Sequence, residues 1–250
     1  KWVGFAMDLL LNWELGEVPN SDNLTIESQV MPHIDLANIA CGFHAGDLSL
    51  MNKTLLLAKK SMVAVGAHPS YPDKFNFGRQ SMTMSATDLM ACLKYQIGSL
   101  EKVASNNDIC ISYVKPHGAL YNDMMTNGHL RNAVMAAIAD SKACSSLMLQ
   151  ATADTDIHQQ EANAFGLNLY LEVFADRAYQ DNGTLVPRHQ SGAMLNSKGM
   201  LAQVKQLKQD GSVTTINGNR LSLNANTLCV HGDNPEAVAQ ICQIKAILAP

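Results

Sequence analysis

The stretch ANIACGFHAGD at Ala37–Asp47 runs from a short apolar segment directly into glycine, histidine and aspartate. In a barrel of parallel strands, functional side chains sit where each strand ends and the next loop begins. Five such stretches therefore predict five strand ends that meet at one mouth, although they lie far apart in the sequence. The other four are VGAHPSYPD at Val65–Asp73, YVKPHGALY at Tyr113–Tyr121, EVFADRAY at Glu172–Tyr179 and TLCVHGD at Thr227–Asp233.

Short apolar runs alternate with longer segments of helical periodicity, which is typical of parallel strands joined by crossover helices. This order predicts one α/β domain over residues 1–250, folded as a barrel of seven strands. Asn217-Gly218 predicts a hairpin inserted at 212–226, and Asp47 is the expected N-cap of the helix after it. The predicted strands are 3–12, 36–41, 63–67, 110–115, 147–152, 169–174 and 227–230, and the helices are 48–61, 86–104, 129–142, 198–209 and 235–248.

The composition is that of a globular domain with a large core. Of the 250 residues, 47% are apolar and 16% charged, and the formal net charge is −4. Lysine and arginine are scattered, so no nucleic acid is expected as a partner. No apolar run could span a bilayer and no signal-peptide pattern occurs, so a cytoplasmic protein without membrane association is expected. The six cysteines form no CxxC pair and are expected to be reduced and buried, with Cys41 the one candidate nucleophile.

The ends of the first three predicted strands carry candidate catalytic groups. Glu14, in the segment NWELGE, is a candidate acid, base or metal ligand. Glycines on both sides of His44 would let the backbone approach a ligand, and His68 follows the third strand. No HExxH, HxH or HxxxH motif occurs, so a metal would need ligands from separate strands, and Glu14, His44 and His68 form a suitable set. The remaining histidines are expected to be surface or packing residues: His33, His129, His158 and His189.

Charged groups also follow the later strands. Lys115 ends an apolar strand, where its amine needs a partner, so it is either part of a structural ion pair or an anchor for a substrate anion. Arg79 follows Gly78, which lets the loop fold back. Strand alternation places Asp176 on the same face as Glu172. The further candidates for substrate binding are Asn12, His117, Arg177, Arg188, His231 and Asp233.

Together, these motifs closely resemble the LamB/YcsF family over nearly the whole chain. The resemblance implies a distorted seven-stranded (β/α) barrel like that of the glycoside hydrolase/deacetylase superfamily. It also implies a 5-oxoprolinase reaction, in which the lactam of 5-oxo-L-proline is opened to L-glutamate with ATP and with partner subunits B and C. The absence of a GxxxxGK[ST] loop fits ATP being handled by those partners. The matching segments are NWELGE, ANIACGFHAGD, GAHPSYPD with FGR, YQIGSL, VKPHGALYN, EVFADRAY with GTLVPR, and TLCVHGD.

For that activity, our hypothesis gives each candidate a role. Glu14 or Asp176 acts as the base that activates water. His44 and His68 polarise the reacting centre, directly or through a divalent metal. Lys115 and Arg79 hold the anionic groups.

The chain departs from the family pattern DLN-x-D-x-GE, because the first aspartate is Leu10 here and the second is Glu14. If the missing aspartate belongs to the site, Leu10→Asp should return a carboxylate beside it and raise activity. Two other functions stay open. One is a metal-dependent deacetylase of N-acetylated sugars, suggested by the fold alone, and the other is a non-catalytic subunit that binds a small acid.

Overall fold

Seven parallel strands close into a barrel in the order β1–β2–β3–β4–β5–β6–β9, as the sequence predicts. A computed structural model describes residues 7–17, 24–231 and 235–249. The barrel closes where β9 pairs with both β1 and β6, so the first and last strands lie side by side. The strands are β1 (Leu10–Leu15), β2 (Leu36–Ala40), β3 (Ala64–His68), β4 (Ile111–Val114), β5 (Ser146–Gln150), β6 (Asn168–Phe174) and β9 (Thr227–Val230).

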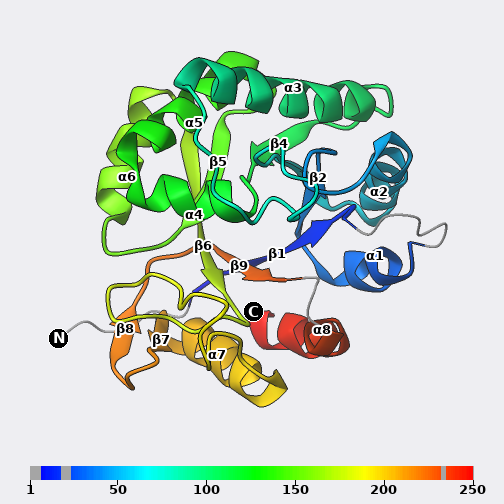
Figure 1. The fold of residues 1–250 in the computed structure, drawn as a ribbon. Helices are drawn as coiled ribbons and strands as arrows, with labels where there is room; N and C mark the ends of the chain where they lie inside the picture. The colour runs from blue at the N-terminus through cyan, green and yellow to red at the C-terminus, as the bar shows by residue number, and fades with distance from the viewer. Residues whose placement is uncertain (1–6, 18–23, 232–234, 250) are drawn as a thin grey trace.

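The α-helices lie around the outside of the strands (Figure 1). The helix at 48–61 has its predicted bounds, and Asp47 caps it by accepting a 2.8 Å hydrogen bond from the amide of Leu50. None of the helices in the described ranges is long and apolar enough to cross a membrane. The helices are α1 (Thr25–Val30), α2 (Leu48–Ser61), α3 (Ala86–Ser105), α4 (Gly118–Thr126), α5 (Gly128–Ser141), α6 (Thr155–Ala164), α7 (Ser197–Asp210) and α8 (Pro235–Leu248), with a 3-10 turn at Met31–His33.

The first strand lies later in the sequence than the predicted range of 3–12. It covers Leu10–Leu15, while residues 1–6 fall outside the described ranges. Its side chains alternate, so that Leu11, Trp13 and Leu15 are buried in the hydrophobic core. The apolar run ends before Glu14, yet the strand continues through it, because Glu14 finds a charge partner at the barrel mouth. Glu14 is therefore a strand residue and not part of the loop that follows.

The base of the barrel interior is filled by a small apolar cluster of Leu36, Tyr113 and Met148. The Tyr113 ring lies across Gly66, where an added Cβ would come within 2.2 Å of the ring. Gly66 is therefore the residue that lets Tyr113 occupy the interior. The hydroxyl of Tyr113 donates a 2.7 Å hydrogen bond to Oδ1 of Asn38, and Asn38 begins a polar layer above the apolar one. The interior thus changes from apolar to polar toward the mouth.

Two excursions follow β6. The segment 175–196 connects β6 to α7. Within it, Arg177 pairs with Met194 and Tyr179 pairs with Leu185, each pair as an isolated antiparallel bridge. The short strands β7 (Ser212–Thr214) and β8 (Arg220–Ser222) pair antiparallel, with Asn217-Gly218 in the connecting turn.

The cysteines only partly match the expectation of buried thiols. All six are free, and Cys41 and Cys229 are buried. Cys110 and Cys242 are exposed instead, because Cys110 precedes β4 and Cys242 lies on the outer face of α8.

Candidate functional site

A cavity of about 550 Å³ opens at the mouth of the barrel. Its lining comes from strand ends and from the loops after them, which is where the sequence places its candidates. Pro116, Gly118 and Phe174 supply part of the apolar and backbone surface. The predicted site residues that line the cavity are Glu14, Arg79, Lys115, His117, Arg177, Arg188 and His231.

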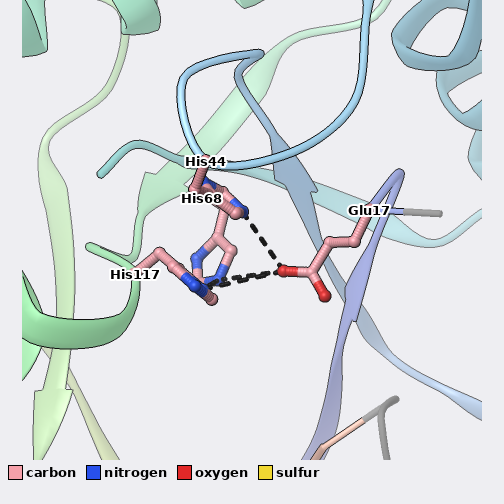
Figure 2. Close-up of side chains that lie close together, drawn as sticks. All are labelled: Glu17, His44, His68 and His117. Carbon is pink, nitrogen blue, oxygen red and sulfur yellow. Dashed lines mark hydrogen bonds and ion pairs between the residues drawn. The ribbon is translucent and has the colours of Figure 1, made fainter. Parts of the chain in front are cut away.

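Beside this cavity, three imidazoles and one carboxylate converge, and we call Glu17, His44, His68 and His117 the histidine cluster (Figure 2). The Oε1 atom of Glu17 lies 3.2 Å from Nε2 of His44, 3.6 Å from Nδ1 of His117 and 4.0 Å from Nε2 of His68. Nδ1 of His117 lies 2.9 Å from Nε2 of His68. The four donors come from the ends of β1, β3 and β4 and from the loop after β2.

Backbone carbonyls fix the tautomers of two of these rings. Nδ1 of His68 lies 2.7 Å from the carbonyl oxygen of Lys115, and Nε2 of His117 lies 3.0 Å from that of Phe77. A carbonyl oxygen only accepts, so each of these nitrogens carries the ring proton. Burial and the nearby His68 hold the pKa of His44 well below its usual value. Burial and the two neighbouring imidazoles do the same for the pKa of His117, so both rings are neutral at neutral pH.

Two glycines make the histidine cluster possible. Gly16 has a φ of +74°, which turns the chain directly after β1 and brings Glu17 back toward the mouth. Gly78 has a φ of +65°, and a Cβ there would lie 2.9 Å from Cβ of His44 and 3.0 Å from Cδ2 of His117. The His44 and His117 rings stack with centroids 3.9 Å apart. A side chain at position 78 would push this stack apart.

The second polar centre surrounds the ammonium of Lys115, whose side chain is almost fully buried. Its Nζ lies 2.8 Å from Oε1 of Glu172, 3.1 Å from Oε1 of Glu14 and 3.2 Å from Sγ of Cys229. Burial alone would lower the pKa of Lys115, but the surrounding acidic groups, with Glu172 and Glu14 among them, raise it well above its usual value. Burial raises the pKa of Cys229, so this thiol is neutral and the charges that face the ammonium are those of the two carboxylates.

A hydrogen-bond network supports this lysine centre from below. The side-chain amide of Asn12 donates 2.8 Å bonds to Glu172 and to Thr227, so it links β1 with β6 and β9. Tyr121 donates a 2.8 Å bond to the other oxygen of Glu172, and Asn38 donates to Asn12. Asn12 is therefore buried beneath the cavity and does not line it, which places this predicted substrate-binding residue among the supporting groups.

Glu14 lies between the two centres. Its Oε1 is 3.5 Å from Nε2 of His68 and 3.1 Å from Nζ of Lys115. Burial alone would raise the pKa of Glu14, but Lys115 and His68 outweigh it and hold that pKa well below its usual value. Glu14 is therefore ionised at neutral pH and faces the cavity as a carboxylate.

On the opposite strand ends, Asp176 and His231 form a pair. Nδ1 of His231 lies 3.0 Å from Oδ1 of Asp176, which is fully buried behind the ring. With Nδ1 donating to this carboxyl group, Nε2 is the ring nitrogen that can exchange a proton with a ligand. The His231 ring also stacks on Phe174, with centroids 5.4 Å apart.

The predicted set of Glu14, His44 and His68 is only partly the group that the structure assembles. Glu17, and not Glu14, is the carboxylate within the histidine cluster, and His117 joins as a third imidazole. Asp176 is behind His231 and does not line the cavity, while His189, expected to be ordinary, does line it. Asp233 lies outside the described residues. Cys41 is buried and its pKa is raised to about 12, which does not suit a nucleophile.

For four residues of the site, the sequence predicts no catalytic or binding role: Glu17, Glu172, Tyr121 and Cys229. A signal exists for two of them. Cys229 stands two residues before His231, so strand alternation places both on one side. Glu17 directly follows Gly16, the one residue in NWELGE that can reverse the chain.

Comparison with known proteins extends along almost the whole chain. Residues 9–249 match the LamB/YcsF family. The A subunit of 5-oxoprolinase from Pseudomonas fluorescens (strain Pf0-1) is 45% identical over 241 residues, which cover 96% of each chain. Its counterpart from Vibrio cholerae (strain ATCC 39541) is 43% identical over 95% of this chain and 96% of its own.

A solved structure is similar as well. The crystal structure of the lactam utilization protein from Thermus thermophilus superposes with a TM-score of 0.85 at 32% identity, over 97% of this chain and 96% of that one. Sequence and fold therefore agree from end to end, and the chain belongs to the LamB/YcsF family.

Proposed function

We propose that this chain is the A-type component of a 5-oxoprolinase, which opens the lactam of 5-oxo-L-proline to L-glutamate with hydrolysis of ATP. The observation that carries the proposal is the full-length similarity, at 42–45% identity, to proteins named as the A subunit of 5-oxoprolinase. These matches cover about 96% of both chains, so the resemblance includes every strand end that contributes to the mouth.

The cavity has the chemistry that a small carboxylic acid requires. Arg79, Arg177 and Arg188 line it and bring guanidinium groups, which bind carboxylates through paired hydrogen bonds. Lys115 is less suited to that task, because Glu172 and Glu14 already balance its charge. We therefore assign the substrate carboxylate to the arginine side of the cavity, and Lys115 to holding Glu14 in place.

The reaction needs activation because an amide resists attack by water. We assign that step to ATP and to partner subunits of the B and C type, which transfer a phosphoryl group to the lactam oxygen. Water then adds to the ring carbon, the C–N bond breaks, and the nitrogen takes up a proton. The acyl phosphate that remains is then hydrolysed by a second water molecule, which releases inorganic phosphate and leaves the side-chain carboxylate of glutamate.

A side chain of this protein would accept the proton of the attacking water in this step. His231 is the base that we favour, because Asp176 fixes its tautomer and its ring faces the cavity. A positioned general base contributes about 100- to 10,000-fold to a rate. Glu14 is the alternative base. Its low pKa keeps it ionised, but it also makes Glu14 a poor proton acceptor at neutral pH.

The test is reconstitution of the purified chain with B- and C-type subunits. We expect glutamate to form from 5-oxoproline only when ATP and all three chains are present. The variant His231→Gln in the same complex should lose about 100-fold or more of the turnover. Deacetylation of N-acetylated sugars by this chain without ATP would contradict the proposal, and so would binding of 5-oxoproline with no turnover in the full complex.

A further inference from the structure

Four donor atoms of the histidine cluster lie within 4.8 Å of one another: one carboxylate oxygen of Glu17 and one ring nitrogen each of His44, His68 and His117. We propose that this cluster binds a divalent first-row transition-metal ion, with Zn²⁺ as the probe. The proposal differs from the set suggested by the sequence, because Glu17 replaces Glu14 and His117 is added.

The ring protons give the first argument. His68 and His117 each donate their proton to a backbone carbonyl, as the 2.7 Å and 3.0 Å contacts require. The remaining nitrogens, Nε2 of His68 and Nδ1 of His117, then face each other as lone pairs only 2.9 Å apart. Two acceptors at this distance need a cation between them. A proton can bridge two atoms but not four, and Nε2 of His44 and Oε1 of Glu17 also converge here.

The distances fit a coordination sphere. Ligand bonds of about 2.0 Å place the donors of a tetrahedral site about 3.3 Å apart. The measured separations are 2.9 Å between His117 and His68, and 3.2, 3.6 and 4.0 Å from Glu17 to the three rings. The donor set also suits such a metal, since imidazole and carboxylate bind Zn²⁺ and its neighbours.

The groups around the cluster are those of a metal site. Ligating histidines usually donate their other N–H to a carbonyl or carboxylate, which fixes the ring and raises its basicity. The carbonyls of Lys115 and Phe77 have this position for His68 and His117. All three histidines are buried, and Gly78 leaves no side chain between the rings of His44 and His117.

A second group of possible ligands, Glu14, Cys229 and His231, is less suitable. The ammonium of Lys115 lies 3.1 Å from Glu14 and 3.2 Å from Cys229, so it occupies the centre of that group and would repel a dication.

One of the proposed ligands, His117, lines the cavity, as does the neighbouring Glu14. An ion in the histidine cluster would therefore lie next to the cavity and could act as a Lewis acid on the reacting group. This catalytic use rests on the proposed function. The binding itself does not, and it can be measured without turnover.

Calorimetric titration tests the binding. The chain is first stripped of metal with a chelator and then titrated with Zn²⁺. Four proteins are compared: the wild type, Glu17→Gln, Glu14→Gln and His189→Gln. His189 is the control because it lines the cavity but lies outside the histidine cluster. We expect one saturable equivalent, weakened about 100-fold or more in Glu17→Gln, because even outer partners of a metal contribute 10- to 100-fold. Glu14→Gln removes a charge beside the site but no ligand, so it should weaken binding less than Glu17→Gln does, and His189→Gln should bind within a few-fold of wild type. Absence of a saturable equivalent, or equal affinity in Glu17→Gln, overturns the proposal.

X-ray absorption of the Zn²⁺-loaded wild-type chain needs no variant to fold. Three imidazoles in the first coordination shell support the site, and two or fewer overturn it. The two proposals can fail separately. Turnover by a metal-free reconstituted complex would remove the Lewis-acid role, and a bound equivalent of Zn²⁺ without any turnover would remove the proposed function while supporting the site.

Discussion

The histidine cluster and the lysine centre lie side by side at the barrel mouth, yet they are balanced in different ways. Around Lys115, opposite charges are in direct contact, since the carboxylates of Glu172 and Glu14 flank one ammonium. Hydrogen bonds from Asn12 and Tyr121 complete the acceptors of Glu172. In the histidine cluster, by contrast, ring nitrogens meet without a proton to share.

This difference separates polar groups that stabilise the barrel from polar groups that bind a ligand. A buried network in which each polar group has a partner within the protein holds the strands in place, and its loss lowers stability. A group of donors that is incomplete by itself indicates a ligand. Glu14 belongs to both centres, so it should affect chemistry and electrostatics together.

The largest effect is expected from Glu14→Gln, which removes the charge that joins the two centres. The amide keeps the size of the side chain but loses the charge that contacts Lys115 and His68, and we expect turnover of the reconstituted complex to fall about 100- to 1,000-fold, as for loss of one preorganised polar group in an active site. Initial rates of glutamate formation would measure this. Glu101→Gln, an exposed change on α3, is the matched control and should leave the rate intact. Unchanged turnover in Glu14→Gln would show that the charge joining the two centres has no part in the reaction.

The next effect concerns stability. Glu172→Gln leaves the buried ammonium of Lys115 with the carboxylate of Glu14 alone, and loss of a buried hydrogen bond to a charged group costs about 1.5–3 kcal/mol of unfolding free energy. Urea denaturation followed by circular dichroism would measure it. The control is Asp140→Asn, which breaks an exposed pair with Lys94 and should cost less than about 1 kcal/mol. Equal stability of the two variants would mean that the lysine centre is not the supporting network that we describe.

A pH series on the chelator-treated chain should distinguish the two centres again. The pKa values of His44 and His117 are lowered by folding, so the unfolded chain takes up protons first as the pH falls through about 6.5. The stabilisation is therefore present above that pH and is lost below it, by about 1.4 kcal/mol per pH unit for each histidine. Unfolding free energies would be measured by urea titration at successive pH values. The double variant His44→Gln, His117→Gln should flatten this slope, and a wild-type slope in that variant would contradict the assignment.

The smallest effect is expected at Leu10, where the sequence alone suggested that an aspartate would raise activity. Leu10 pairs with Thr227 at the amino end of β1, on the far side of Asn12 from Glu14. At about 3.3 Å per residue, a side chain there is about 13 Å along the strand from position 14. We expect Leu10→Asp to leave turnover unchanged and, since the side chain is 41% exposed, to change stability by about 0.5 kcal/mol or less. Increased glutamate formation would restore the original hypothesis.

The barrel could be predicted because strand ends repeat one pattern of apolar residues followed by glycine and a polar group. The start of β1 could not be located in this way, since its pairing depends on β2 and β9 and not on the local apolar run. Helices α1, α4 and α6 have no counterpart in the prediction, because α1 has only six residues, α4 follows directly from a site motif and α6 is mostly polar.

The candidate residues were recognisable by type and position, but their pairing was not. Whether Glu14 or Glu17 meets the histidines depends on the turn at Gly16. Whether Lys115 meets a substrate or a carboxylate depends on Glu172, which lies on a different strand. Both are distances between segments remote in sequence, which no local pattern contains.

The two hydrogen bonds from Asn12, to Glu172 and to Thr227, have a consequence for how the chain folds during its synthesis. It joins the earliest described strand to the last one across the seam of the barrel. While the chain leaves the ribosome, β1 has no neighbour on that side until β9 has been synthesised. The contacts that Asn12 makes across the seam can therefore form only late in synthesis, after both β6 and β9 have been made.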